Sequence, residues 1–215
     1  MSYLLHIDSS SLGADSVSRQ VAQSFRDSWR GPVVHRDLGA APVPHLSAAG
    51  ITTRSTDESA RTPDQAAAAA IQEELVGEFL GASAYLFTVP MYNYSIPSVF
   101  KAWLDQIMSV GTTMGLPDGP PAAGRPALVI SARGGGYGPG APNHGMDHVI
   151  PTLETVLGHR LTLGLDVRVL TPELTFARIM PHMSGLIPLH EASLADSHEQ
   201  ARKLAEAFQA ALLRL

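Results

Sequence analysis

The sequence predicts a three-layer α/β fold, in which a five-stranded parallel sheet is covered by helices on both faces. Short apolar runs alternate with longer stretches whose apolar residues recur every three or four positions, as expected for strands alternating with amphipathic helices. Strands that are buried on both faces belong to parallel sheets. Because no repeat or linker-like segment divides the chain, we expect residues 1–215 to form a single domain.

The first half of the chain shows this alternation of strands and helices. Residues 3–7 are a short apolar run, and a polar loop follows them at 9–15. Apolar side chains then recur at every fourth position over 17–29, which predicts a helix with one buried face. Val33 and Val34 form a second short strand, and a long irregular connection over 39–60 follows.

The next two helices have clear sequence signals. Thr62 is suited to be an N-cap, Pro63 the first helical residue, and Gln65 the partner that completes a capping box. A buried strand follows at 83–89. After it, apolar residues at helical spacing over 96–107 predict another helix.

The second half repeats the pattern. A proline-rich loop ends at Pro126, where the fourth strand begins, and that strand leads into a glycine-rich loop at 134–140. We expect a helix from about Met146 to Leu157 and a strand at 166–170. Residues 172–190 are a second long irregular connection, and such connections in compact domains are often functional. The chain then closes with a helix whose apolar face runs from Ala201 to Leu212.

Composition excludes several classes of protein. The 215 residues include no cysteine, so thiolate catalysis, disulfides, cysteine-ligated zinc and iron–sulfur clusters are excluded. The net charge of −5 comes without a basic run, which argues against nucleic-acid binding. No apolar stretch nears the roughly 20 residues of a membrane helix. The first residues have no signal-peptide pattern, so we expect a cytoplasmic protein that binds no membrane.

Three loops carry unusual chemistry, and each follows a strand, at the sheet edge where parallel α/β folds bind ligands. Serine hydroxyls over 9–18 precede a helix, whose free N–H groups favour an anion such as a phosphomonoester. Tyrosines and an asparagine over 90–98 can stack on a flat ring and bind its edge. Consecutive glycines over 131–138 let the backbone approach a ligand closely. Taken singly, each loop is also compatible with a turn or a helix cap.

The order of the motifs is more specific than any one of them. Serines at 9–18 are followed by PMYNYSIP at 90–97, KAWLDQ at 101–106, GTT at 111–113 and RGG at 133–135. Over about residues 2–170 the chain resembles the FMN-dependent NAD(P)H azoreductase and quinone oxidoreductase family, which has a flavodoxin-like fold. The resemblance implies a bound FMN, NADH or NADPH as electron donor, and a quinone or azo compound as acceptor. It also implies a ping-pong reaction in a homodimer whose active site lies at the interface.

The resemblance also assigns site residues. The FMN phosphate would be held by Ser10, Ser16, Val17 and Ser18. The isoalloxazine ring would be lined by Met91, Tyr92, Asn93, Tyr94, Ala132, Arg133, Gly134 and Gly135. Because Tyr137 follows the glycines directly, we expect it to position the acceptor or relay a proton. Two departures stand out: Ala132 replaces a common serine, and Met114 replaces an aromatic residue near the expected substrate.

Three other interpretations were open. His144 and His148 lie four residues apart and could bind zinc, but with Asp147 between them they more simply mark a helix start, and we expect no metal. A serine hydrolase built on Ser10 lacks the GxSxG motif. An FMN-containing electron carrier or regulatory module shares the same cofactor site and would not oxidise NAD(P)H quickly.

Overall fold

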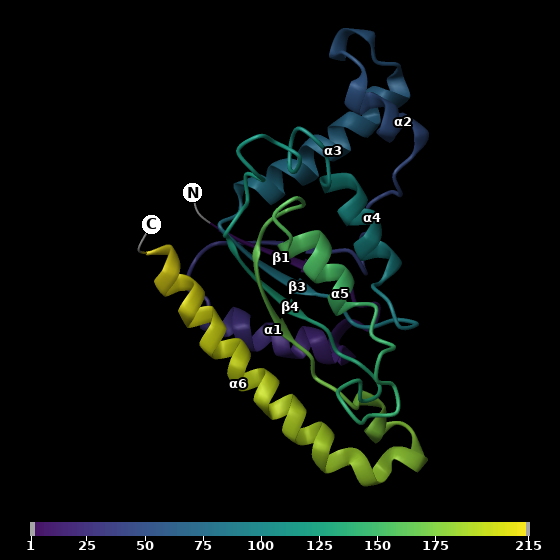
Figure 1. Ribbon diagram of the computed structural model, residues 1–215, viewed down its shortest axis with the longest axis vertical. Helices are drawn as coiled ribbons and strands as arrows, with labels where there is room; N and C mark the ends of the chain where they lie inside the picture. Colours follow the sequence, from purple (N-terminus) through teal and green to yellow (C-terminus); the bar gives the residue numbers. More distant parts are fainter. Residues whose placement is uncertain (1–2, 214–215) are drawn as a thin grey trace.

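A computed structural model describes residues 3–213 and confirms the parallel sheet (Figure 1). The strand order is β2-β1-β3-β4-β5, and all neighbouring strands are parallel. The strands are β1 (Leu4–Asp8), β2 (Val33–Asp37), β3 (Ala84–Thr88), β4 (Pro126–Ile130) and β5 (Asp166–Leu170). The strand order reverses between β1 and β3, which places the ligand-binding edge of the sheet beside the loops that follow these strands.

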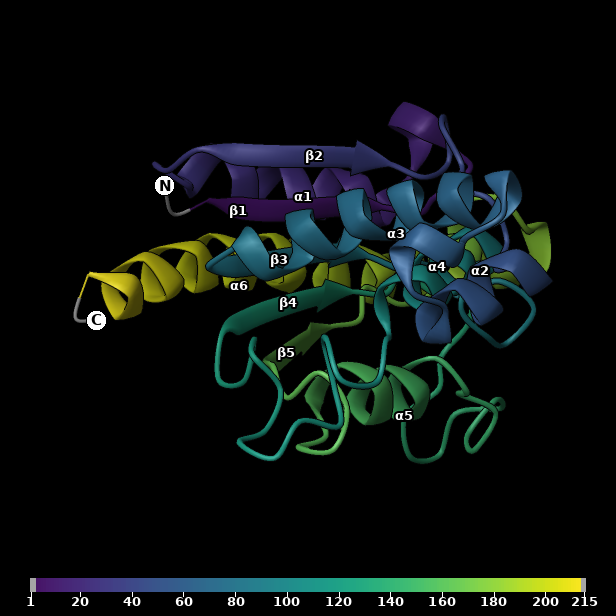
Figure 2. The same cartoon turned by 90° about the horizontal axis from the view of Figure 1, so that it is seen from above.

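Helices cover both faces of the sheet, as predicted (Figures 1 and 2). One face carries α1 (Val17–Ser28) and α6 (Ile187–Leu212). The other carries α3 (Pro63–Gly81), α4 (Ser98–Ile107) and α5 (Ile150–Leu153). Within residues 3–213, none of the helices is long and apolar enough to cross a membrane.

The two faces of the sheet hold separate apolar cores. Along β1, Leu4 packs in the cluster with α1 and α6, whereas Leu5 and Ile7 pack in the cluster with α3, α4 and α5. This alternation follows from the period of two residues along a strand. Because every residue of β1 is buried, the backbone at its carboxyl end has a rigid support.

The start of α3 is built as predicted. The hydroxyl of Thr62 accepts a hydrogen bond from the Gln65 N–H, and the Gln65 side chain accepts one from the Thr62 N–H. Pro63 occupies the first helical position, where its missing N–H removes no helix bond. The reciprocal capping box therefore fixes where this helix begins.

The helix expected from Met146 to Leu157 begins later, at Ile150. The Asp147 carboxylate accepts hydrogen bonds from the N–H groups of Val149 and Ile150, at 2.8 and 3.1 Å, and so caps this end. The helix then widens into a π-type turn over Glu154–Gly158. Asp147 thus marks a helix start, as interpreted, but the helix is shorter than predicted.

Two connections hold more structure than the sequence indicated. Residues 39–60 contain the short helix α2 (Ala48–Thr52) and two 3₁₀ turns. The connection expected over 172–190 contains two further 3₁₀ turns, and the last helix begins inside it, at Ile187. Its first half turns the polar side chains of His190 and Ser197 inward, so no apolar periodicity reveals it.

Candidate functional site

The loops after β1 and β3 meet at the carboxyl edge of the sheet. The phenol oxygen of Tyr92 lies 3.0 Å from the backbone nitrogen of Ser11 and 3.3 Å from Oγ of Ser10. The Ser11 N–H donates to this oxygen, and the hydroxyls of Tyr92 and Ser10 share a hydrogen bond. Two segments far apart in sequence therefore form one continuous surface.

The serine-rich loop ends at the positive end of α1. Ser16 is the N-cap, and its Oγ accepts a hydrogen bond from the Arg19 N–H at 3.4 Å. The hydroxyls of Ser16 and Ser18 lie 3.1 Å apart, and both residues are buried. Val17 is the first helical residue, where backbone N–H groups lack helical partners. Hydroxyls, free N–H groups and the helix dipole together favour an anion at this position.

An ion pair between Arg19 and Asp37 anchors this loop. The Arg19 guanidinium donates to both carboxylate oxygens of Asp37, at 2.6 Å each, and to the Ser10 carbonyl at 2.8 Å. This pairing lowers the pKa of Asp37 and raises that of Arg19. Gly39 packs directly against the Ser10 carbonyl, where a Cβ atom would collide with the backbone. The loop therefore has little freedom to move.

Next to this ion pair lies a buried carboxylate flanked by two histidines. Asp8 is 2.8 Å from Nε2 of His35 and 3.4 Å from Nε2 of His6, and Thr88 donates a hydrogen bond to it. Burial alone would raise the pKa of Asp8, but the hydrogen bonds from the histidines and Thr88 outweigh it, so the pKa is lowered. Burial lowers the pKa of His6. Arg26 donates to Nδ1 of His6 at 2.9 Å, which leaves the proton of the neutral ring on Nε2. The Nε2 lone pair is then unavailable to a metal ion.

The segment after β3 contains a strained tight turn. Tyr92 and Ser95 exchange two backbone hydrogen bonds of 3.0 Å, with Asn93 and Tyr94 between them at φ values of 49° and 66°. Two consecutive positive φ values define the type I′ geometry, which asparagine tolerates and tyrosine does not favour. Such strain persists where the surrounding structure imposes it, and it is typical of ligand sites.

The glycine loop after β4 lies against the segment after β5. A Cβ atom on Gly134 would lie 2.5 Å from the Phe176 ring, and one on Gly135 would collide with the Asn143 amide. The Phe176 N–H donates to the Gly134 carbonyl at 3.2 Å. A side chain at 134 or 135 would therefore force Phe176 or Asn143 to move, because these neighbouring side chains pack directly on the glycine backbone.

Arg133 is buried and links three loops. Its Nη2 donates to Asp147 at 2.8 Å, and its Nη1 lies 3.6 Å from the Glu173 carboxylate. Its guanidinium also lies 5.2 Å from the centre of the Tyr137 ring. The Glu173 carboxylate in turn accepts a hydrogen bond from the Tyr137 N–H. The Arg133 side chain thus connects the glycine loop after β4 to Asp147 and Glu173.

A cavity of about 590 Å³ opens between these loops. Of the residues expected at a flavin ring, Met91, Asn93, Tyr94, Gly134 and Gly135 line it, and so does Tyr137. Tyr92, Ala132 and Arg133 do not line it, since Tyr92 turns to the serine loop and Arg133 to its ion pairs. Sequence reasoning missed the other lining residues, which are Gly136, Pro142, Asn143, Leu174, Phe176, His182, Met183 and Leu186.

Tyr137 is placed to contact a molecule in this cavity. Burial raises its pKa, and the nearby Tyr94 adds to the effect, although the Arg133 cation opposes it. The phenol is therefore protonated at neutral pH and can donate a hydrogen bond or a proton. His144 and His148, in contrast, are exposed, and Asp147 between them is held by Arg133 and the α5 backbone.

Comparison with known proteins identifies the family. A family model described as flavodoxin-like fold matches residues 2–160. A protein of Streptomyces avermitilis named FMN-dependent NADH:quinone oxidoreductase is 44% identical over 220 residues, covering 98% of this chain and 100% of its own length. A protein of the same name from Streptomyces coelicolor is 44% identical over 207 residues, covering 94% of this chain and 92% of its own.

Solved structures share the fold. An azoreductase from Bacillus anthracis superimposes with a TM-score of 0.78 at 23% identity, covering 95% of this chain and 99% of its own. A second one from that organism, described as an FMN-dependent NADH-azoreductase in complex with FMN, gives a TM-score of 0.78 at 20% identity, covering 95% and 98%. The family match and the close relatives together show that the chain belongs to the flavodoxin-like family that includes the two Streptomyces proteins.

Proposed function

We propose that this protein is an FMN-dependent NADH:quinone oxidoreductase, which also reduces azo compounds. The observation that carries the proposal is the junction of an anion-binding loop with a ring-sized cavity, joined through Tyr92. The names of relatives at 44% identity over nearly the whole chain point to the same activity.

The first loop fits a phosphate group. Ser16 and Ser18 place buried hydroxyls at the first turn of α1, and Val17 adds a helix N-terminal N–H. No lysine belongs to this loop, which suits a single phosphomonoester rather than a nucleotide polyphosphate. Ser10, Ser16, Val17 and Ser18 are therefore the residues that would hold the FMN phosphate.

The cavity at the other end of the proposed site fits a flat aromatic ring. The cavity has the size of small-molecule sites, which span about 300–1,000 Å³. It is lined by the backbone of Gly134 and Gly135, which have no side chains, and by the exposed turn at Asn93 and Tyr94. Backbone N–H groups of such loops bind the polar edge of a heterocycle, while Met91 supplies an apolar contact. These residues would hold the isoalloxazine ring.

Bound FMN would supply the redox chemistry, accepting two electrons from a reduced nicotinamide and passing them to a quinone or azo compound. The protein orients the reactants. The apolar wall at Leu174, Phe176 and Met183 lets a flat molecule enter and keeps water away. The protonated Tyr137 donates a hydrogen bond to the acceptor's oxygen or nitrogen.

Further parts of the proposal concern partners and kinetics. One cavity must receive both donor and acceptor, which supports a ping-pong sequence with NADH or NADPH leaving before the acceptor binds. We infer a homodimer with the active site at its interface, since exposed apolar side chains such as Phe176 and Leu186 line the cavity. We further propose that residues 1–215 form one domain and that the protein works in the cytoplasm.

Initial-rate kinetics test the proposal. NADH oxidation by FMN-loaded protein should depend on a benzoquinone, and double-reciprocal plots at several quinone concentrations should be parallel. NADPH and a soluble azo dye in the same assay define the donor and acceptor classes. A protein that retains FMN but oxidises neither nicotinamide would instead be an electron carrier or a regulatory module.

A further inference from the structure

Phe176 presents an aromatic ring to the cavity of about 590 Å³. The ring lies directly against the backbone of Gly134, since a Cβ atom there would be 2.5 Å from both Cδ2 and Cε2 of Phe176. Although part of the ring is covered in this way, Phe176 remains 47% exposed. An exposed aromatic surface therefore borders the loop that would hold the isoalloxazine ring.

Backbone contacts hold Phe176 in this place. Its N–H donates to the Gly134 carbonyl at 3.2 Å, and the Leu174 N–H donates to the Gly135 carbonyl at 3.3 Å. Leu174 has a φ of 58°, a left-handed conformation that leucine disfavours, and it directly precedes the 3₁₀ turn Thr175–Arg178. Strain of this kind persists where the surrounding structure imposes it. The point from which the Phe176 side chain extends is therefore fixed.

The lining of this cavity favours an uncharged ligand. Among residues 3–213, those that line it include no aspartate, glutamate, lysine or arginine. Leu174, Met183 and Leu186 add apolar surface from the same segment as Phe176. The polar lining groups are amides, phenols and the imidazole of His182, which bind neutral carbonyl groups by hydrogen bonds. A flat, neutral molecule with polar groups at its edge fits this combination.

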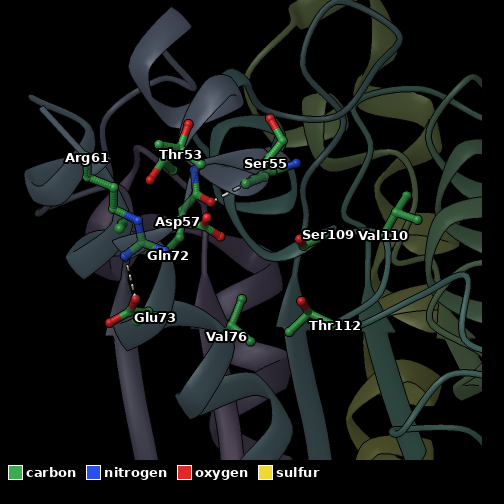
Figure 3. Close-up of a pocket in the computed structure, with 13 residues that line it drawn as sticks. Thr53, Ser55, Asp57, Arg61, Gln72, Glu73, Val76, Ser109, Val110 and Thr112 are labelled. Atoms are coloured by element: carbon green, nitrogen blue, oxygen red, sulfur yellow. Dashed lines mark hydrogen bonds and ion pairs between the residues drawn. The ribbon is translucent and has the colours of Figure 1, made fainter. Parts of the chain in front are cut away.

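A second cavity, of about 420 Å³, lies between the 3₁₀ turns after α2, one face of α3 and the turn after α4 (Figure 3). Its lining differs, because the charged residues Arg54, Asp57, Arg61 and Glu73 take part in it. Figure 3 shows the ion pair between Arg61 and Glu73, in which nitrogen and oxygen are 3.5 Å apart. A neutral aromatic molecule that entered here would remove water from charged groups without replacing its hydrogen bonds. The cavity beside Phe176 is therefore the better site for such a molecule.

Phe176 is also the aromatic lining residue that has no other assigned role. Of the described residues, Tyr94 and Tyr137 are the other two that bring a phenyl or phenol ring to the lining. Tyr94 belongs to the turn that would contact the isoalloxazine ring, and Tyr137 would donate to the acceptor's oxygen or nitrogen. If the quinone ring of an acceptor faces the flavin, a second ring fused to it extends toward the rest of the wall. Aromatic pairs contribute more than their buried area alone, so Phe176 rewards that second ring.

We propose that Phe176 determines the acceptor specificity of this cavity, and that it selects neutral quinones with a fused second ring over monocyclic quinones. The Phe176 ring packs on the fused ring, while the quinone oxygens bind the polar lining groups. The inference rests on the proposed function for the quinone's role as acceptor. The binding preference itself needs no electron transfer, so the two can fail separately.

Equilibrium binding of two probes tests the preference. The compounds 2-methyl-1,4-naphthoquinone and 2-methyl-1,4-benzoquinone differ by one fused ring. The protein is used FMN-loaded and oxidised, so that no electrons pass to the quinone and calorimetry measures each dissociation constant without turnover. The chain has no cysteine, so no thiol adds to the probes. The wild-type protein should bind the naphthoquinone more tightly, and the ratio of the two constants is the quantity compared between variants.

Phe176→Leu keeps an apolar side chain but removes the ring, and it should lower this ratio about fivefold. Phe176→Tyr keeps the ring and should keep the wild-type ratio. The matched control is Ile179→Ala, which removes an exposed apolar side chain of the same segment that does not line the cavity. A merely structural role of Phe176 would weaken the binding of both quinones alike. An unchanged ratio in Phe176→Leu would overturn the proposal.

A measurement on the wild-type protein decides the question even if Phe176→Leu fails to fold. Titration of the ¹⁵N-labelled, oxidised, FMN-loaded protein with the naphthoquinone should give saturable shifts of the amide signals of 174–177. Shifts confined to 53–61 and 109–112 would place the quinone in the second cavity and refute the assignment. If the predicted preference is found but NADH leaves the flavin bands unbleached, the proposed function fails and the binding role of Phe176 stands.

Discussion

The phenol oxygen of Tyr92 accepts a hydrogen bond of 3.0 Å from the backbone N–H of Ser11. The contact joins the loop after β3, which borders the ring-sized cavity, to the loop after β1, which contains the proposed phosphate-binding residues. A ligand with a ring at one end and a phosphate at the other must pass this junction. Tyr92 therefore sets the spacing between the two halves of the proposed flavin site.

Tyr92→Phe removes this contact and the shared hydrogen bond with Ser10. The loss of a hydrogen-bonded bridge predicts a rise of about tenfold in the FMN dissociation constant. Quenching of flavin fluorescence during titration measures it. Tyr3→Phe is the control, because the Tyr3 hydroxyl donates to the Glu78 carbonyl away from the site. An FMN affinity equal to that of wild type would show that the bridge has no role.

Tyr94 combines a positive φ of 66° with a half-exposed side chain. Tyr94→Gly relieves a left-handed conformation that costs a non-glycine residue about 1 kcal/mol, whereas Tyr94→Ala retains that strain. We therefore expect the glycine variant to have a larger free energy of unfolding than the alanine variant in urea. Both variants should bind FMN more weakly than wild type. If the alanine variant were the more stable of the two, the turn would not be strained.

Gly134→Ala places a methyl group against the Phe176 ring. We expect it to destabilise the protein by about 1–3 kcal/mol, as overpacking does. The penalty should be smaller in a Phe176→Ala background, and a double-mutant cycle measures the difference. Gly138→Ala is the control, since a Cβ atom there meets nothing within 4 Å. Equal penalties in both backgrounds would show that the cost of Gly134→Ala does not come from a clash with Phe176.

Arg133→Met leaves the carboxylates of Asp147 and Glu173 without their buried cation. Breaking a buried ion pair by removing one partner predicts a loss of about 3 kcal/mol in the free energy of unfolding. Arg168→Met removes an exposed arginine and should change it by less than about 1 kcal/mol. Urea unfolding of the two variants tests the contrast. Similar small losses in both would mean that Arg133 does not brace the loops.

His6 should make stability depend on pH. Burial lowers its pKa below the ordinary value of 6.5, so the unfolded chain binds a proton that the folded chain does not. Stability should therefore decrease as pH falls below about 6.5. The lowered pKa of Asp8 acts only in a more acidic range, below its ordinary value of 3.8.

Unfolding in urea at pH 7.5 and at pH 5.5 measures this effect. The difference between the two free energies should shrink in His6→Gln and persist in the exposed control His144→Gln. Burial also lowers the pKa of His198, so part of the pH dependence should remain in His6→Gln. An undiminished dependence in His6→Gln would assign the whole effect to other groups.

Local patterns were enough to predict the strands, the helices and the capping box at Thr62, because each depends on neighbouring residues, and the alternation of strands with helices then implied the parallel sheet. Contacts between distant segments could not be predicted in this way. Phe176 packs on Gly134 and Arg133 pairs with Glu173 only once β4 and β5 lie side by side. The turn at Tyr94 opposes the residue's own backbone preference, so no local rule indicates it.

The most direct test of the central claim is the absorption spectrum of the purified, FMN-loaded protein during anaerobic addition of NADH and then a benzoquinone. The proposed function predicts flavin bands that bleach with NADH and return with the quinone. Flavin bands that persist with both NADH and NADPH would contradict the oxidoreductase assignment and support an electron carrier. Failure to take up FMN at all would contradict the cofactor site itself.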